Sequence, residues 1–131
     1  MPAIHIQVSA SKTPHLTKEI SDTVLDLTTR ILKKKKEVTA ILIDFIEPDA
    51  WSIGGRFLSA SNKQSFYLQI TITDETNTKD EKAHYVKEIF AAFEKILGPL
   101  DEESYVYVQD VRAASYGYGG KTQEYRYQHP R

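Results

Sequence analysis

The residue with the most distinctive chemistry is the proline at the second position of the chain. An initiator methionine is readily removed before a small residue, and Pro2 would then be an N-terminal secondary amine. Such an amine is a base and a nucleophile, and in a desolvated pocket beside a cation its pKa falls towards neutrality, where general bases work best. The sequence therefore offers Pro2 as a general base. If Met1 is retained, the Pro2 nitrogen is an amide without basicity, and any chemistry lies elsewhere.

Pro2 leads directly into a predicted strand. Residues 3–8 alternate apolar and polar side chains, which is the period of a half-buried strand. Thr13 and Pro14 fit the N-cap and the first position of a helix, and apolar residues then recur at spacings of three and four over about five turns. Residues 39–46 are β-branched and apolar, so they predict a buried second strand. This order predicts a right-handed βαβ unit with parallel strands.

Four consecutive lysines, residues 33–36, follow the first predicted helix. Cations near a helix C-terminus complement the helix dipole, and such side chains usually lie in solvent. We interpret this run as an exposed helix end rather than as a site for an acidic partner.

The second half of the chain repeats the pattern of the first. Residues 66–73 alternate as a strand, residues 78–97 carry apolar side chains at helical spacing, and residues 105–108 predict a fourth strand. The turn Gly54-Gly55-Arg56 recurs as Gly119-Gly120-Lys121, an offset of 65 residues (from 54 to 119) that also sets Trp51 opposite Tyr116. The sequence thus predicts one domain, residues 1–131, made of two pseudo-repeats, 1–63 and 64–131.

Two βαβ units predict an α+β fold, with a four-stranded sheet and both helices on its apolar face. The other face would carry polar and aromatic side chains: His5, Gln7, Tyr67, Gln69, Thr71, Tyr105 and Tyr107. This mixture is better satisfied by burial in an oligomer, around a polar central channel, than by exposure. Residues 122–127 alternate tyrosine with charged residues and predict a further strand that reaches a neighbouring subunit.

Composition excludes several other functions. The absence of cysteine excludes disulfides and thiolate sites and suits a reducing cytoplasm. The longest apolar runs are far too short to span a membrane, and a net charge of −1 offers no general attraction to nucleic acid. The four histidines lack the spacing of a metal site, and no phosphate-binding glycine loop is present. We expect a cytoplasmic protein with no cofactor, no metal, no nucleic-acid partner and no membrane partner.

Pro2, the strand Ile-His-Ile-Gln-Val, the helix, the apolar strand and the turn Trp-Ser-Ile-Gly-Gly together resemble the 4-oxalocrotonate tautomerase superfamily. Its short members have one βαβ unit with a Phe-Gly-Ile-Gly-Gly turn, and its longer members have two fused units. The length and duplication of this chain resemble the fused, trimer-forming members, among them cis-3-chloroacrylic acid dehalogenase, malonate semialdehyde decarboxylase and macrophage migration inhibitory factor. The resemblance implies a homotrimer that acts without a cofactor.

The resemblance also implies roles for particular residues. Pro2 would be the catalytic base and Trp51 the aromatic wall of the pocket. Lys12 falls where the family has an arginine that grips a substrate carboxylate, and lysine keeps the charge but loses the bidentate fork. The second family arginine falls on Ala40, so Arg56 or Arg112 would have to replace its charge.

Asp110 falls near the acidic residue that positions water in the dehalogenase, and it is a possible acid or base here. The paired arginines of that enzyme have no counterpart around residues 73–75, so dehalogenation is not expected. Tyr116, Tyr118 and Arg112 lie near the second turn. They would either donate hydrogen bonds to a developing enolate oxygen or only pack a subunit interface, and both readings stay open.

The leading hypothesis is therefore a keto–enol tautomerase that uses Pro2 as its base on a small unsaturated 2-oxo or 2-hydroxy acid with a carboxylate. Hydration or decarboxylation in the same pocket is the nearest alternative chemistry. A trimeric binding or assembly module without efficient catalysis is the alternative from another class, which the loss of charge at Ala40 supports.

Overall fold

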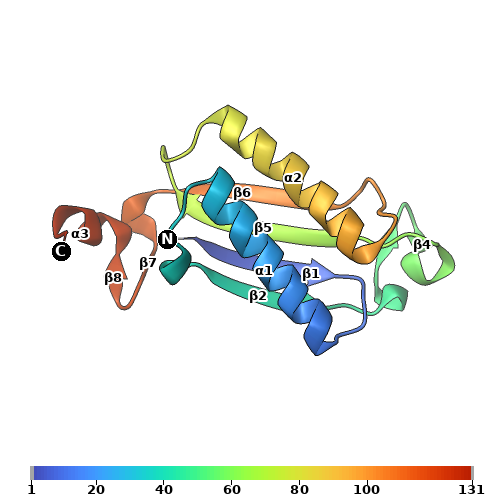
Figure 1. Cartoon of the computed structure of the whole chain (residues 1–131). Helices are drawn as coiled ribbons and strands as arrows, with labels where there is room; N and C mark the ends of the chain where they lie inside the picture. The colour runs from blue at the N-terminus through green and yellow to red at the C-terminus, as the bar shows by residue number, and fades with distance from the viewer. Residues whose placement is uncertain (1, 131) are drawn as a thin grey trace.

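The computed structural model describes residues 2–130 and is built around one four-stranded mixed sheet. From one edge to the other, the strands are β2 (Ala40–Phe45), β1 (Ala3–Val8), β5 (Phe66–Thr73) and β6 (Tyr105–Val111). The outer pairs, β1 with β2 and β5 with β6, are parallel, whereas the central pair of β1 and β5 is antiparallel. Helices α1 (Pro14–Ile31) and α2 (Lys79–Leu97) lie side by side on one face (Figure 1). The predicted α+β fold with a duplicated βαβ unit is confirmed.

Two short hairpins extend from opposite ends of the sheet. The first consists of β3 (Ser52–Ile53) and β4 (Arg56–Phe57), and the second consists of β7 (Gly117–Tyr118) and β8 (Lys121–Thr122). Because β1 and β5 are antiparallel, the second βαβ unit runs in the opposite direction to the first. The β7–β8 hairpin therefore lies at the end of the sheet where the chain begins, and β4 lies at the other end (Figure 1). Four 3₁₀ turns complete the connections: η1 (Lys36–Val38), η2 (Pro48–Ala50), η3 (Leu58–Ala60) and η4 (Ala113–Ser115).

The predicted start of the first helix is confirmed, and the second helix begins with a cap that the sequence interpretation did not name. Thr13 caps α1 by accepting a hydrogen bond from the backbone N–H of Leu16, and Pro14 takes the first helical position. Thr78 and Glu81 form a reciprocal capping box at the start of α2. None of the helices within residues 2–130 is both long and apolar enough to cross a membrane.

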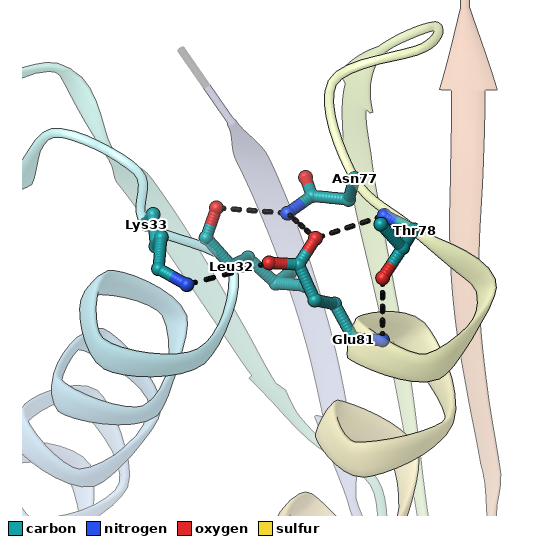
Figure 2. A network of polar contacts seen from close by, with 5 residues as sticks. All are labelled: Leu32, Lys33, Asn77, Thr78 and Glu81. Carbon is teal, nitrogen blue, oxygen red and sulfur yellow. Dashed lines mark hydrogen bonds and ion pairs between the residues drawn. The ribbon is translucent and has the colours of Figure 1, made fainter.

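A polar network joins the end of α1 to the start of α2 (Figure 2). Asn77 donates one hydrogen bond to the carbonyl of Leu32, which closes α1, and another to the carboxylate of Glu81. The ammonium of Lys33 lies 3.4 Å from the same carboxylate. The network fixes the connection between β5 and α2 against the end of α1, so both segments are held over the same end of the sheet.

The core lies between the helices and the inner face of the sheet. Phe66 of β5 stacks on Phe93 of α2, with ring centroids 4.2 Å apart. Tyr85 of α2 is fully buried, and its hydroxyl bonds the hydroxyl of Thr28 on α1 at 2.8 Å. The remaining buried members come from both units: Ile4, Ile6, Val8, Ile20, Val24, Leu27, Ile31, Leu32, Leu68, Ile70, Ile72, Ile89 and Leu100.

The predicted strand at residues 122–127 is wrong, because this segment is the helix α3 (Gln123–Gln128). The hairpin turn at Gly119 and Gly120 uses both glycines at positive φ, and Thr122 then accepts a hydrogen bond from the backbone N–H of Tyr125 as an N-cap. A period of two over six residues does not separate a strand from a short helix. The cap and the packing of Arg126 on Tyr118 decide in favour of the helix.

We expect the stability of the protein to fall at high pH through Tyr85. Burial raises the pKa of Tyr85 to about 12 from its ordinary value of 10.0, so its stabilising contribution is complete below pH 10 and is lost as the pH rises through 12. A difference of this size corresponds to about 2–3 kcal/mol. Tyr85→Phe should be about 1 kcal/mol less stable than wild type at pH 7, because it loses the bond to Thr28, and this deficit should shrink between pH 10 and 12.

Urea unfolding followed by circular dichroism at a series of pH values measures this difference. Tyr127→Phe is the matched control, since Tyr127 is 86% exposed, and its unfolding free energy should follow that of wild type at every pH. A deficit for Tyr85→Phe that stays constant up to pH 12 would contradict the prediction.

Candidate active site

Pro2 lies at the start of the central strand β1 and is buried. Its carbonyl accepts a hydrogen bond from the backbone N–H of Ala40, at 3.2 Å. Ala3 pairs with Thr71 of β5, so Pro2 lies beside the last residues of β5. The alanine that stands at the position of the second family arginine is therefore a direct neighbour of Pro2, and no guanidinium enters the site from there.

The second hairpin, and not the first, belongs to the same end of the protomer as Pro2. Tyr116 precedes β7, and its hydroxyl bonds the hydroxyl of Thr73, the last residue of β5, at 2.5 Å. Burial raises the pKa of Tyr116, and the bond to Thr73 opposes this rise. The phenol is therefore protonated at neutral pH and able to donate a hydrogen bond.

Asp110, Arg112 and Tyr118 share this end but differ in their partners. Asp110, near the end of β6, forms an ion pair of 2.6 Å with Lys82 of α2, and both side chains are less than one-third exposed. Tyr118 is covered by Arg126, whose guanidinium carbon lies 3.9 Å from the ring centroid and which also donates to the carbonyl of Tyr118. Arg112 directly follows β6 and is exposed.

Lys34, which the sequence interpretation did not single out, lies at the same end of the sheet as Pro2. Its ammonium is half-buried and donates to the hydroxyl of Thr76 at 2.9 Å. Burial lowers the pKa of Lys34, whereas the negative charges of Glu81 and Asp110 raise it. The order of the predicted elements already indicated this position for Lys34. The helix of a βαβ unit runs antiparallel to its strands, so it ends at the end of the sheet where the first strand begins. The lysines after α1 therefore had to lie near Pro2.

Lys12, Trp51 and Arg56 lie at the opposite end of the protomer. Lys12 follows the C-terminal end of β1, and the run from Pro2 to Val8 spans about 20 Å at about 3.3 Å per residue. The Trp51 ring packs edge-on against Tyr67, with centroids 5.5 Å apart. Arg56 donates to the carbonyl of Ala60 within its own connection, at 2.6 Å.

Trp51 lines a hollow of about 290 Å³ at that end, together with Gln7, Ile46, Ala50, Ser52 and Tyr67. Trp51 cannot contact the Pro2 of its own protomer, because the length of β1 separates the two residues. Trp51 would meet Pro2 only across an interface between copies of the chain.

The outer face of the sheet is uncovered in the single chain and carries few charges. Leu42 on the edge strand β2 is 61% exposed, and Tyr105 and Tyr107 on the opposite edge strand β6 stack on each other with centroids 5.8 Å apart. On this face a ring nitrogen of His5 is hydrogen-bonded to the carboxylate of Asp44 at 2.6 Å. Among residues 2–130, the structure shows no group of three histidine, aspartate or glutamate side chains arranged to hold a metal ion.

Neither a protein-family model nor a curated protein matches the sequence. Solved structures, however, match nearly the whole chain. Native fused 4-OT is 14% identical, with 94% of this chain and 97% of that chain covered and a TM-score of 0.82. A wild-type fused 4-OT asymmetric trimer is 14% identical over the same shares, with a TM-score of 0.80. A macrophage migration inhibitory factor-like protein from Entamoeba histolytica is 17% identical, with 92% and 97% covered and a TM-score of 0.75.

These likenesses establish the fold of the chain, which is the fold of the fused 4-OT structures and of the macrophage migration inhibitory factor-like protein. The chain has the overall architecture of native fused 4-OT. The resemblance to the 4-oxalocrotonate tautomerase superfamily drawn from Pro2 and the Trp-Ser-Ile-Gly-Gly turn is confirmed in the fold.

We expect the pKa of Lys34 to depend on the two carboxylates that face it. Glu81 raises it more than Asp110 does, so Glu81→Gln should lower the pKa of Lys34 further, and Asp110→Asn should lower it by less. Carbon-13 NMR of lysine side chains, titrated against pH, measures both changes. Asp44→Asn, which alters a carboxylate on the outer face of the sheet, is the control and should leave Lys34 unchanged. A Lys34 titration that is the same in all three variants would contradict this electrostatic account.

Proposed function

We propose that this protein is a tautomerase that acts without a cofactor on a small unsaturated 2-oxo or 2-hydroxy acid, in the cytoplasm. The observation that carries the proposal is the place of Pro2. This residue opens a central strand of a fold shared with fused 4-OT, and an ammonium and a protonated phenol lie at the same end of the sheet.

In this reaction the Pro2 nitrogen, exposed by removal of Met1, takes a proton from the enol hydroxyl or from a carbon next to the carbonyl. It returns the proton at the other position. The reaction moves one proton and one double bond, so it is balanced without an oxidant or a reductant. A secondary amine near neutrality is suited to both steps, since it must accept and release the proton with similar ease.

Two groups beside Pro2 have properties that suit the charges of such a substrate. The ammonium of Lys34 has three hydrogens and uses one on Thr76, so it has donors for a substrate carboxylate. The phenol of Tyr116 is protonated and would donate to the oxygen of the enolate as negative charge develops there. Lys34 thus supplies near Pro2 the positive charge that Ala40 lacks.

A homotrimer would complete the site. Trp51, Lys12 and Arg56 lie at the far end of the protomer from Pro2, so they would reach a Pro2 only in a second copy of the chain. The uncovered outer face, with Leu42 61% exposed, is consistent with burial against other copies. Fused 4-OT structures are trimers.

Hydration or decarboxylation in the same pocket remains the nearest alternative chemistry. A hydratase needs a carboxylate that is available to position water, whereas Asp110 is held by Lys82 in a pair that is mostly shielded from solvent. This pairing favours tautomerisation over hydration. A trimeric module without efficient catalysis is the alternative in which Pro2 has no chemical role.

We expect Pro2→Ala to lower the rate of ketonisation of phenylenolpyruvate and 2-hydroxymuconate by at least about 100-fold, because it replaces the rigid secondary amine with a primary amine of different basicity and position. Ultraviolet spectroscopy follows both reactions, and intact mass must first confirm that the wild-type protein begins at Pro2. Pro130→Ala, at the far end of the chain, is the control and should keep the wild-type rate. Full activity in Pro2→Ala, or in protein that retains Met1, would exclude the proline mechanism.

If the site is shared between copies, two inactive variants should complement each other. We expect Trp51→Ala to lose at least about tenfold in kcat/KM, and joint refolding of Trp51→Ala with Pro2→Ala to restore activity well above that of either parent. In a mixed trimer, a Trp51→Ala copy supplies an intact Pro2 and a neighbouring Pro2→Ala copy supplies an intact Trp51, so one complete site can form. Pro2→Ala refolded with Tyr116→Phe is the control. Both residues come from the same end of one protomer, so this pair should restore nothing, and equal behaviour of the two mixtures would contradict a shared site.

A further inference from the structure

Resting on the proposed function, we infer that Thr73 and Thr76 are positioning residues of the site. Thr76 holds the Lys34 ammonium that grips the substrate carboxylate, and Thr73 holds the Tyr116 phenol that donates to the enolate oxygen. The two threonines belong to one short segment, the end of β5 and the turn that follows it. This segment fixes the two binding groups relative to each other and to Pro2.

The two hydrogen bonds of the Thr76 hydroxyl allow only one assignment of donor and acceptor. Its hydroxyl donates its single proton to the carbonyl of Thr73 at 2.6 Å. The oxygen of this hydroxyl must therefore accept from Lys34, which lies 2.9 Å away. The ammonium is thus bound at a defined point and keeps its two other hydrogens for a carboxylate.

The hydrogen bond of Thr73 fixes the phenol in the same way. The hydroxyls of Thr73 and Tyr116 lie 2.5 Å apart. When Thr73 donates its proton to the phenol oxygen, the phenol directs its own proton to another acceptor, which in the complex is the substrate oxygen. The carbonyl of Thr73 meanwhile accepts from Thr76, so one residue links both branches of the network.

The location of this segment suits a substrate bound at Pro2. The register sets Ala3 opposite Thr71, which continues to Pro2 opposite Ile72. Thr73 is then one residue further along, with neighbouring strands about 5 Å apart and about 3.3 Å between successive residues. Groups anchored on Thr73 and Thr76 therefore lie at the end of the sheet where β1 begins.

Both anchored groups need such support because neither belongs to a rigid element. Lys34 lies between α1 and η1, and Tyr116 lies between η4 and β7. A lysine side chain loses up to about 2 kcal/mol of conformational entropy when it is ordered. A bond formed before the substrate arrives moves this cost out of the binding step, which is the basis of preorganisation.

Steady-state kinetics with phenylenolpyruvate, on protein that begins at Pro2, separates the two roles. Thr73→Val should lower kcat about tenfold with KM within about twofold of wild type, because a lost hydrogen bond of this kind is worth up to about tenfold. Thr76→Val should instead raise KM about tenfold with kcat nearly unchanged. Thr73→Ser and Thr76→Ser keep the hydroxyl and should restore wild-type values.

Thr71→Val is the matched control. Thr71 lies on the same strand and the same face as Thr73 and is similarly half-buried, and its substitution should change neither kcat nor KM. The inference is overturned if the serine variants are as impaired as the valine variants, if Thr71→Val is equally impaired, or if both valine variants behave as wild type.

Two readouts test the positioning without turnover. The bond to Thr73 lowers the pKa of Tyr116, so Thr73→Val should raise it, as measured by carbon-13 NMR of the tyrosine ring. Thr76→Val should change the NMR signals of the Lys34 side chain. If neither signal moves, the inference fails even in an active enzyme. If both move while the wild-type protein shows no turnover that depends on Pro2, the positioning holds and the proposed function fails.

Discussion

The antiparallel pairing of β1 with β5 is the constraint on which the rest of the structure depends. Each βαβ unit alone has parallel strands, and the two units join through a register in which Ile6 faces Leu68. Because of this pairing, the strands of the second unit run in the opposite direction to the strands of the first. It therefore places the second hairpin beside Pro2 and sends the first hairpin, with Trp51, to the other end of the sheet. The composition of the candidate site follows from this one pairing.

The same arrangement leaves the sheet with two different faces. The inner face is closed by α1 and α2 around Phe66, Phe93 and Tyr85, and its buried side chains are satisfied within the chain. The outer face carries the exposed Leu42 and a row of tyrosines with a single His–Asp pair, and nothing in one chain covers it. The separation of Trp51 from Pro2 and this uncovered face are two consequences of one topology. Both favour the assembly of several copies as the functional unit.

Several polar side chains at the Pro2 end are held in pairs by neighbouring residues. Asp110 is held by Lys82, and Glu81 takes part in the capping of α2 and in an ion pair with Lys33 (Figure 2). The ammonium of Lys34, by contrast, bonds a neutral hydroxyl. Asp110 and Glu81 are thus tied to structural partners, while the ammonium of Lys34 and the phenol of Tyr116 are each bonded by a threonine. This distribution suits the binding of an anion.

The sequence by itself determined the four long strands, both long helices, the duplication and the basic chemistry of an N-terminal Pro2, because these depend on local periodicity, on the cap at Thr13 and on repeated turns. The prediction of a strand at residues 122–127 is wrong, because an alternation over six residues is too short to exclude a helix capped by Thr122.

The sequence interpretation places Lys34 in solvent at the end of a helix. The direction of α1, which ends where β1 begins, already implied that Lys34 lies at the Pro2 end of the sheet. Only the tertiary structure decided that Tyr116, Thr73 and Lys34 lie at the Pro2 end of the sheet and that Trp51 lies at the other end. Strand register and hydrogen bonds between residues some forty positions apart are long-range properties, and no local pattern encodes them.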